Sequence, residues 1–182
     1  NGDVVLSANA LSVNAYNAIL ADSATITILG TGAVGTQALP LQLWVNDLAF
    51  TTGGGSVFAS SPGGGLSIGV GATGVDLNGG SFWLSANGPI SQTQAITAAA
   101  LNVASTGGAI TLANTGNAFA TLTVSTGGSN DATIYDSTAV TVASANVGGT
   151  FALTSAGAIG QSGAITAAAL NVASTGGAIT LA

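Results

Sequence analysis

A verbatim internal copy constrains this chain more than any other feature. The nineteen residues from Ala95 to Ala113, AITAAALNVASTGGAITLA, recur unchanged from Ala164 to Ala182, at an offset of 69 (164 − 95 = 69). The same offset aligns Phe82 with Phe151 and extends the similarity, with interruptions, over about thirty positions. Copying at a fixed period is the signature of repeat architectures, in which each unit stacks on the next. The copy therefore predicts an elongated, repetitive fold.

The copies divide the chain into three stretches of one continuous array. Residues 1–78 keep a Gly, Ser and Ala style without a clear repeat, and we predict irregular coils there. Residues 79–147 form the first 69-residue repeat, and residues 148–182 form a partial second one. Because the second copy stops inside the repeat, we expect this sequence to be a piece of a longer array.

Short segments in which apolar and polar residues alternate run through the repeat. Alternation with period two predicts strands that have one buried and one solvated face. The nearest approach to a helix, ITAAAL from Ile96, is short and uncapped, so a narrow strand or a corner is the better prediction. The alternating segments are LNVAS from Leu101, AITLA from Ala109, TLTVS from Thr121, VTVAS from Val140 and FALTS from Phe151.

Turn signals separate these strands at roughly regular spacing, as in STGG from Ser105 and NTGN from Asn114. Such spacing fits an antiparallel sandwich or a solenoid, but a sandwich gives no reason to copy so long a stretch verbatim. We therefore predict an all-β fold, a parallel β-solenoid (β-helix), with about three coils of roughly 23 residues per 69-residue repeat. Four shorter coils per repeat are the alternative. Stacking at the interstrand spacing would give about 8 coils and a rod of roughly 38 Å.

The composition restricts the available chemistry. The chain has no Lys, Arg, His, Cys or Met, and its net charge is −6. Without cations it cannot neutralise phosphates, so we expect no nucleic-acid partner. Gly, Ser, Thr and Asn interrupt every apolar run well short of the roughly 20 residues that span a bilayer, so we expect no membrane insertion. We also expect no cofactor.

The acidic residues are all Asp, and they do not suggest an active site. Only Asp131 and Asp136 lie close in sequence, and we interpret the first as a turn residue and the second as a strand-end cap. No Ser can be activated where there is no His, and no Lys can act as a base. We therefore predict that the chain is not an enzyme and has no catalytic residue. The six acids are Asp3, Asp22, Asp47, Asp76, Asp131 and Asp136.

Two further patterns are similar to ligand-binding motifs. The stretch GATGVDLNGG from Gly71 partly imitates a calcium-binding nonapeptide, but it occurs once, and Asp76 is better interpreted as a plain turn residue, so we assign no metal. The Thr-x-Thr pairs that begin at Thr25 and Thr121 are similar to those of ice-binding solenoids. Because the pairs do not recur at a constant coil offset, ordinary outward strand positions explain them as well.

Aromatic residues supply the best candidate for a surface contact, because flat rings suit sugars. Phe82 and Phe151 share one repeat position, which favours an internal stack of the two rings. Trp83 corresponds to Ala152 in the second copy, so we expect Trp83 to point outward and to be the residue that makes a surface contact.

The repeat as a whole resembles a known family. The string GGTFALTSAGAIGQSGAITAAALNVASTGGAITLA from Gly148, together with NTGNAF and TLTVSTGG, is similar to the repeats of filamentous haemagglutinin and related large exoproteins of two-partner secretion. The likeness covers residues 79–182. It implies a right-handed parallel β-helix shaft, export through an outer-membrane partner, and an extracellular or bacterial cell-surface location. The family's secretion signature is not seen in this sequence, and no receptor motif can be carried over.

These observations predict a structural shaft or filament subunit that supports adhesion, aggregation or a biofilm matrix. Its expected partner is the chain itself, through end-to-end or lateral stacking of coils. The alternative is an adhesin whose solenoid face binds glycans or cell surfaces, and an ice-binding rod is the third hypothesis.

Overall fold

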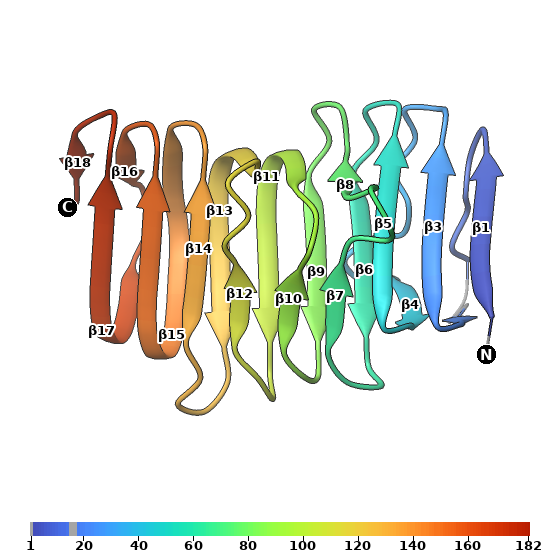
Figure 1. Cartoon of the computed structure of the whole chain (residues 1–182), viewed down its shortest axis with the longest axis horizontal. Coiled ribbons are helices and arrows are strands. Elements are labelled where there is room, and N and C mark those ends of the chain that lie inside the picture. The colour runs from blue at the N-terminus through green and yellow to red at the C-terminus, as the bar shows by residue number, and fades with distance from the viewer. Residues whose placement is uncertain (1, 15–17) are drawn as a thin grey trace.

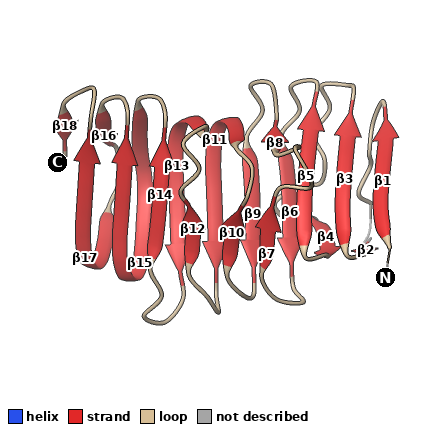
Figure 2. Ribbon diagram, in the orientation of Figure 1, coloured by secondary structure: helices blue, strands red, loops and turns tan. Residues whose placement is uncertain are grey.

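The computed structural model describes residues 2–14 and 18–182, and its regular structure there consists of strands. Figure 2 shows the strands joined by loops and turns, without a helical segment among the described residues. Within this part of the chain, no helix is long and apolar enough to cross a membrane. The all-β prediction is confirmed.

Eighteen strands follow one another along the described part of the chain, and their bounds show how short most of them are. The first nine are β1 Asp3–Ala8, β2 Ala18–Leu20, β3 Ser23–Ile28, β4 Leu41–Trp44, β5 Asp47–Thr52, β6 Val57–Ser61, β7 Leu66–Ile68, β8 Val75–Asp76 and β9 Phe82–Ala86. The second nine are β10 Ile90–Gln92, β11 Ile96–Ser105, β12 Ile110–Leu112, β13 Ala118–Thr126, β14 Ala132–Asp136, β15 Val140–Ser155, β16 Ile159–Gln161, β17 Ile165–Ser174 and β18 Ile179–Thr180.

Strands β1 to β16 each pair in parallel with a strand one turn further along the chain, which builds a β-solenoid of about nine turns (Figure 1). The pairs form two ladders, which we call face A and face B. The sequence step per turn varies, for example 25 from Val57 to Phe82 (82 − 57) and 19 from Phe82 to Leu101 (101 − 82). Face A is represented by Leu66, Ile90, Ile110, Ala132, Phe151 and Leu170. Face B is represented by Val57, Phe82, Leu101, Leu122, Val142 and Gln161.

The core lies between the two faces and is filled by the inward residues of the alternating strands. Strand β11, for example, buries Leu101 and Val103 while Asn102 and Ala104 between them stay partly accessible. The segment ITAAAL is thus part of a strand, as predicted. The largest fully buried side chains include Phe50, Phe82, Phe119 and Phe151. Burial of each of these rings contributes a few kcal/mol.

Phe82 and Phe151 are both buried, but the expected stack between them is wrong. Phe82 pairs with Leu101 on face B, whereas Phe151 pairs with Leu170 on face A. The two rings therefore belong to different ladders on opposite sides of the tube. The reason is the number of turns in the repeat.

The 69-residue repeat spans three and a half turns, which refines the estimate of about three. Starting at Leu101, face B leads through Leu122 and Val142 to Gln161, which is three turns over a sequence distance of 60 (161 − 101). The nine positions left over (170 − 161) carry the chain across to Leu170 on face A. Figure 1 shows the result: the bends beside β11 and β13 lie at the top of the view, and those beside β15 and β17 lie at the bottom.

The segment predicted to contain irregular coils, residues 1–78, belongs to the same solenoid wherever it is described. Strands β1, β3 and β5 stack in regular parallel register. An insertion then breaks the periodicity, because Ile68 lies beside Leu48 and Val75 beside Phe50. Residues 69–74 thus loop out opposite the single residue Ala49, without interrupting the stack.

Candidate functional site

Two rows of outward side chains on face B form the floor of a shallow groove. The first row consists of Phe58, Trp83, Asn102 and Thr123, which pair in this order across four successive turns. The second row, two positions further along each strand, consists of Ser60, Ser85, Ala104 and Ser125, and all of these except Ser60 line the groove. Because strands of adjacent turns lie about 4.8 Å apart, each row presents its side chains at a regular spacing.

The rings of Phe58 and Trp83 stack on each other in the first row. Their centroids are 5.4 Å apart and their planes are inclined by 20°. Offset stacking of this kind contributes about 0.5–1.5 kcal/mol beyond the area that it buries. Both side chains remain partly accessible, so the stack is a fixed apolar platform rather than a part of the core.

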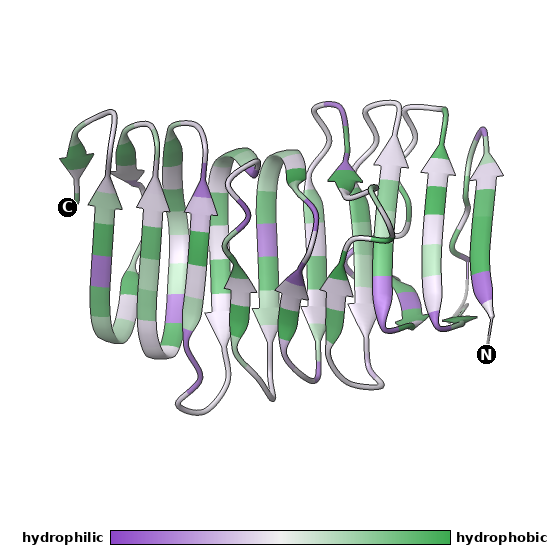
Figure 3. Cartoon of the chain, in the orientation of Figure 1, coloured by the Kyte–Doolittle hydropathy of each residue, from purple (hydrophilic) through white to green (hydrophobic). Residues whose placement is uncertain are grey.

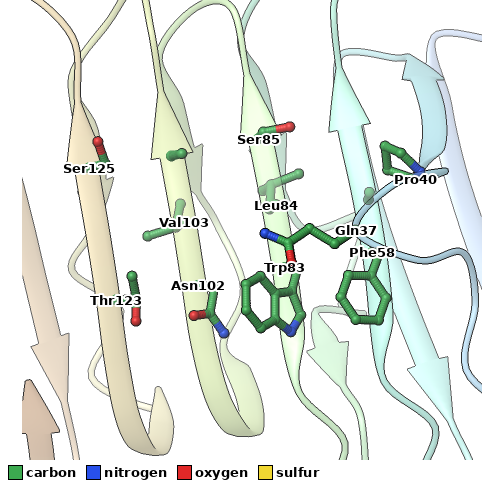
Figure 4. Close-up of a pocket in the computed structure, with 12 residues that line it drawn as sticks. Gln37, Pro40, Phe58, Trp83, Leu84, Ser85, Asn102, Val103, Thr123 and Ser125 are labelled. Carbon is green, nitrogen blue, oxygen red and sulfur yellow. The ribbon is translucent and has the colours of Figure 1, made fainter. Parts of the chain in front are cut away.

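A loop on the N-terminal side of β4 forms one wall of the groove. Val34 bridges to Val57, and the Phe58 amide donates a hydrogen bond to the Val34 carbonyl oxygen at 2.9 Å. Gly35 then turns the chain with a φ of +70°, and a Cβ there would lie 2.8 Å from the Phe58 carbonyl oxygen. The loop places Gln37 and Pro40 beside the aromatic platform, as Figure 4 shows.

The groove holds about 270 Å³ and carries no formal charge, since none of the described residues that line it is ionisable. Its surface combines aromatic and aliphatic carbon with the amides of Gln37 and Asn102 and the hydroxyls of Ser85 and Thr123. A few polar groups around an apolar floor are the usual composition of small-molecule sites.

Trp83 points outward, as its alignment with Ala152 predicted, and it lies at the centre of this groove (Figure 4). Sequence reasoning counted Phe58 among the aromatic residues that could form a sugar-stacking surface, but it did not pair Phe58 with Trp83. A signal was present, because SVFASS from Ser56 and SFWLSA from Ser81 share one pattern and occupy successive turns. The irregular spacing caused by the 69–74 insertion obscured it.

The two neighbouring acids have the separate structural roles that the sequence suggested. Asp131 is exposed in a turn, and its Oδ1 accepts a hydrogen bond from the Thr150 amide at 2.6 Å. Asp136 ends β14 fully buried and accepts from the amides of Phe119 at 3.0 Å and Thr138 at 3.2 Å. Burial raises the pKa of Asp136, and these hydrogen bonds only partly oppose the rise.

Asp76, the residue in the calcium-like stretch, caps a turn. Its Oδ1 accepts a hydrogen bond from the Asn78 amide at 3.1 Å, and Asn78 itself has a φ of +45°. Within the described residues, no group of three Asp, Glu, His or Cys side chains is placed to hold a metal ion. In the Thr25 pair, Thr25 lies between Val5 and Ala49, whereas Thr27 lies between Ser7 and Thr51, so the two columns do not form a regular threonine array.

A buried amide network closes the corner at the end of β12. The Asn117 Nδ2 donates to Gln92 Oε1 at 2.9 Å and to the carbonyl oxygens of Leu112 and Tyr135, both at 3.1 Å. Its Oδ1 accepts from the Ile96 amide at 2.9 Å and from Gln92 Nε2 at 2.8 Å. This network satisfies the polar groups that a tight corner would otherwise bury without partners, and it links three successive turns.

Comparison with known proteins identifies a family. The model of a family described as repeats of unknown function (DUF5649) matches residues 54–126 and 129–182. The first match begins inside the stretch interpreted above as irregular coil. Neither the curated proteins nor the solved structures contain a match to the chain.

Proposed function

The chain belongs to the family of repeats of unknown function DUF5649, and this family supplies no function, so we propose one from the geometry. The chain is a shaft segment of an extracellular bacterial surface filament. We also propose that the chain is related to filamentous-haemagglutinin repeats and is exported by two-partner secretion, as the likeness of its sequence implies. The shaft would support adhesion, aggregation or a biofilm matrix. No catalytic role is proposed, because the chain lacks His, Lys, Arg and Cys.

The observation that carries the proposal is the parallel ladder from β1 to β18. Every described turn is bonded to the next by the same main-chain pairing, so length increases with turn number at about 4.8 Å per turn. The core is continuous along the axis, and its aliphatic ladders hold adjacent turns together. Such a body is quasi-one-dimensional, which suits a spacer that holds other parts of a protein away from a surface.

Electron microscopy of the longer parent polypeptide tests this function. We expect thin rods whose length grows with the number of repeats. Compact globules would refute the shaft. Antibody labelling of intact cells tests the location, and we expect the epitope to be accessible without permeabilisation.

A glycan-binding face is the second candidate, and the Phe58–Trp83 platform is the observation that favours it. Sugar rings stack on aromatic faces, and the amides of Gln37 and Asn102 are placed to hydrogen-bond hydroxyl groups beside them. The groove has no charge, which fits neutral sugars better than phosphorylated ligands.

A glycan array with purified chain tests this second candidate. We expect binding that Trp83→Ala abolishes and that Trp44→Ala retains, since Trp44 is an exposed indole at a different place on the solenoid. Binding to no sugar would leave the shaft as the only proposed function.

A further inference from the structure

Two turns of the solenoid contain an asparagine that is followed directly by a glycine. Asn78–Gly79 lies between β8 and β9, and Asn87–Gly88 lies between β9 and β10. In such a pair the main-chain nitrogen reaches the asparagine side chain more easily than in any other, because glycine has no Cβ that hinders its own nitrogen. The two turns therefore place the same reactive pair in two structural environments.

The first pair supplies the two central residues of a tight turn. The Gly80 amide donates a hydrogen bond to the Leu77 carbonyl oxygen at 2.8 Å, and the φ angles of Asn78 and Gly79 are +45° and +92°. Positive φ angles at both central positions define a type I′ turn, for which Asn-Gly is a preferred pair. Figure 3 shows the loop that contains this turn at the upper edge of the view, with a hydrophilic segment at its tip.

The reacting groups of this first pair are exposed and unrestrained. Among the described residues, neither the Asn78 side-chain amide nor the Gly79 main-chain amide has a hydrogen-bond partner. Both residues are exposed, and a Cβ placed on Gly79 would meet no atom within 4 Å. The peptide group between them therefore has room to rotate until the Gly79 nitrogen faces the Asn78 Cγ.

The second pair is held by the preceding and the following turns. Asn87 Nδ2 donates to the Pro62 carbonyl oxygen at 2.8 Å, and Asn87 Oδ1 accepts from the Thr106 hydroxyl at 3.3 Å. Gly88 is buried, and a Cβ there would lie 2.4 Å from the Gly65 nitrogen. The Asn87 side chain must therefore break two hydrogen bonds, and the buried Gly88 must shift, before the two groups can react.

We propose that Asn78 is a site of spontaneous deamidation, a modification in which water is the only co-reactant. The Gly79 nitrogen attacks the Asn78 Cγ and gives up its proton as the new C–N bond forms, and the side-chain nitrogen leaves as ammonia. Water then opens the resulting cyclic imide at one of its two carbonyl groups, which leaves either aspartate or isoaspartate. Each event adds one negative charge to a chain whose net charge is −6.

The product alters a turn that takes part in the stacking. The Gly80 carbonyl oxygen accepts a hydrogen bond from the Ala99 amide at 2.9 Å, and a Cβ on Gly80 would lie 2.3 Å from the Gly55 carbonyl oxygen. Isoaspartate adds a methylene group to the main chain directly beside these contacts, so we expect deamidation to loosen the loop between β8 and β9. The inference goes beyond the shaft proposal and does not depend on it.

The test is incubation of the full chain in mildly alkaline buffer, followed by chymotryptic digestion and tandem mass spectrometry. Cleavage after Leu77, Phe82 and Leu84 places the two asparagines in different peptides, and each deamidation increases the mass of its own peptide. We expect Asn78 to react at least about tenfold faster than Asn87, because two hydrogen bonds must break at Asn87. The matched control is the same chain unfolded in guanidinium, in which both asparagines should react at similar rates.

A second variant checks the reason for the difference. Thr106→Val removes the hydroxyl that donates to Asn87, so it should accelerate the reaction at Asn87 and leave the rate at Asn78 unchanged. Equal rates at the two asparagines of the folded chain would overturn the proposal, and so would a folded chain that protects Asn78 as strongly as Asn87. A product that is aspartate alone would also overturn it, since direct hydrolysis without the cyclic imide gives no isoaspartate.

Discussion

Leu101 and Leu170 offer a matched pair of core truncations, because they occupy the same position in identical sequences. Leu101 is fully buried in the middle of the solenoid, and Leu170 is 42% exposed on the last complete turn. We expect Leu101→Ala to destabilise the chain strongly and Leu170→Ala to destabilise it weakly. Differences in strand propensity and in sequence neighbours cancel in the comparison, so packing alone separates the two variants.

The expected magnitudes follow from the two exposures. Truncation of a buried Leu removes its transfer free energy and leaves a cavity, which together cost about 3 kcal/mol. For Leu170 the buried fraction is 0.58 (1 − 0.42), and applied to a transfer free energy of about 2 kcal/mol this gives roughly 1 kcal/mol. No enclosed cavity forms at an open edge. The difference of about 2 kcal/mol corresponds to roughly 4–8 °C in the unfolding midpoint for a chain of this size.

Guanidinium unfolding, followed by circular dichroism and by tryptophan fluorescence, measures both variants. Two probes are needed, because the turns of a repeat protein can unfold in sequence rather than all at once. The indoles of Trp44 and Trp83 report on the N-terminal and middle turns, so loss at the C-terminal edge alone should change dichroism before fluorescence. Equal destabilisation by the two substitutions would refute the reasoning, since it would mean that the edge of β17 is covered in solution.

Three other predictions concern single residues. Burial raises the pKa of Asp136, so the folded chain binds this proton more tightly than the unfolded chain. The resulting contribution to stability is complete below the unfolded pKa of about 3.8 and is lost as the pH rises through the folded pKa. Unfolding free energies measured from about pH 3 to pH 7 should therefore show a downward component that Asp136→Asn removes, with Asp131→Asn as the charge-matched control. Replacement of Asn117 by Ala leaves donors and acceptors of three turns without a hydrogen-bond partner. It should lower the free energy of unfolding, measured by chemical denaturation, by at least about 2 kcal/mol. An unchanged midpoint would contradict the role of the corner network. Gly35→Ala forces a side chain into a left-handed conformation against a carbonyl oxygen and should destabilise the chain by about 1–2 kcal/mol. If its spectrum and midpoint match those of the original chain, the groove wall is less constrained than the structure indicates.

Much of the architecture could be predicted from the sequence, because a parallel solenoid is encoded by local patterns. Alternation identified the strands around Leu101, Thr121 and Val140, and the verbatim copy distinguished stacking from a sandwich. The relation of Phe82 to Phe151 could not be predicted in this way. Dividing 69 by a whole number assumes that a repeat contains whole turns, and inward positions on faces A and B carry the same residue types. The sequence pattern is therefore the same whether the repeat contains three turns or three and a half. Only the observed pairing of the strands distinguishes the two cases.

The candidate site was predicted only in part for a related reason. Trp83 was assigned outward by comparison with Ala152, which needs no knowledge of turn length. Its neighbour Phe58 lies one turn earlier at a sequence distance of 25 (83 − 58), while another turn, from Leu41 to Ala59, advances by only 18 (59 − 41). A stack between turns depends on the length of the intervening loops, and those lengths vary without disturbing the core. The wall formed by residues 35–40 depends in addition on a positive φ at Gly35, which a glycine-rich sequence does not single out.

The half-turn remainder of the repeat has a consequence for how such a protein can change in evolution. Tandem copies in a gene are gained and lost as whole units, and each 69-residue unit adds three and a half turns. Gain of a single unit therefore lengthens the rod by about 17 Å and also rotates everything beyond it by about 180°. Gain of two units adds seven whole turns and restores the orientation. Proteins that differ by an odd number of copies would present their distal parts on opposite sides of the solenoid axis, so copy number would set direction as well as reach.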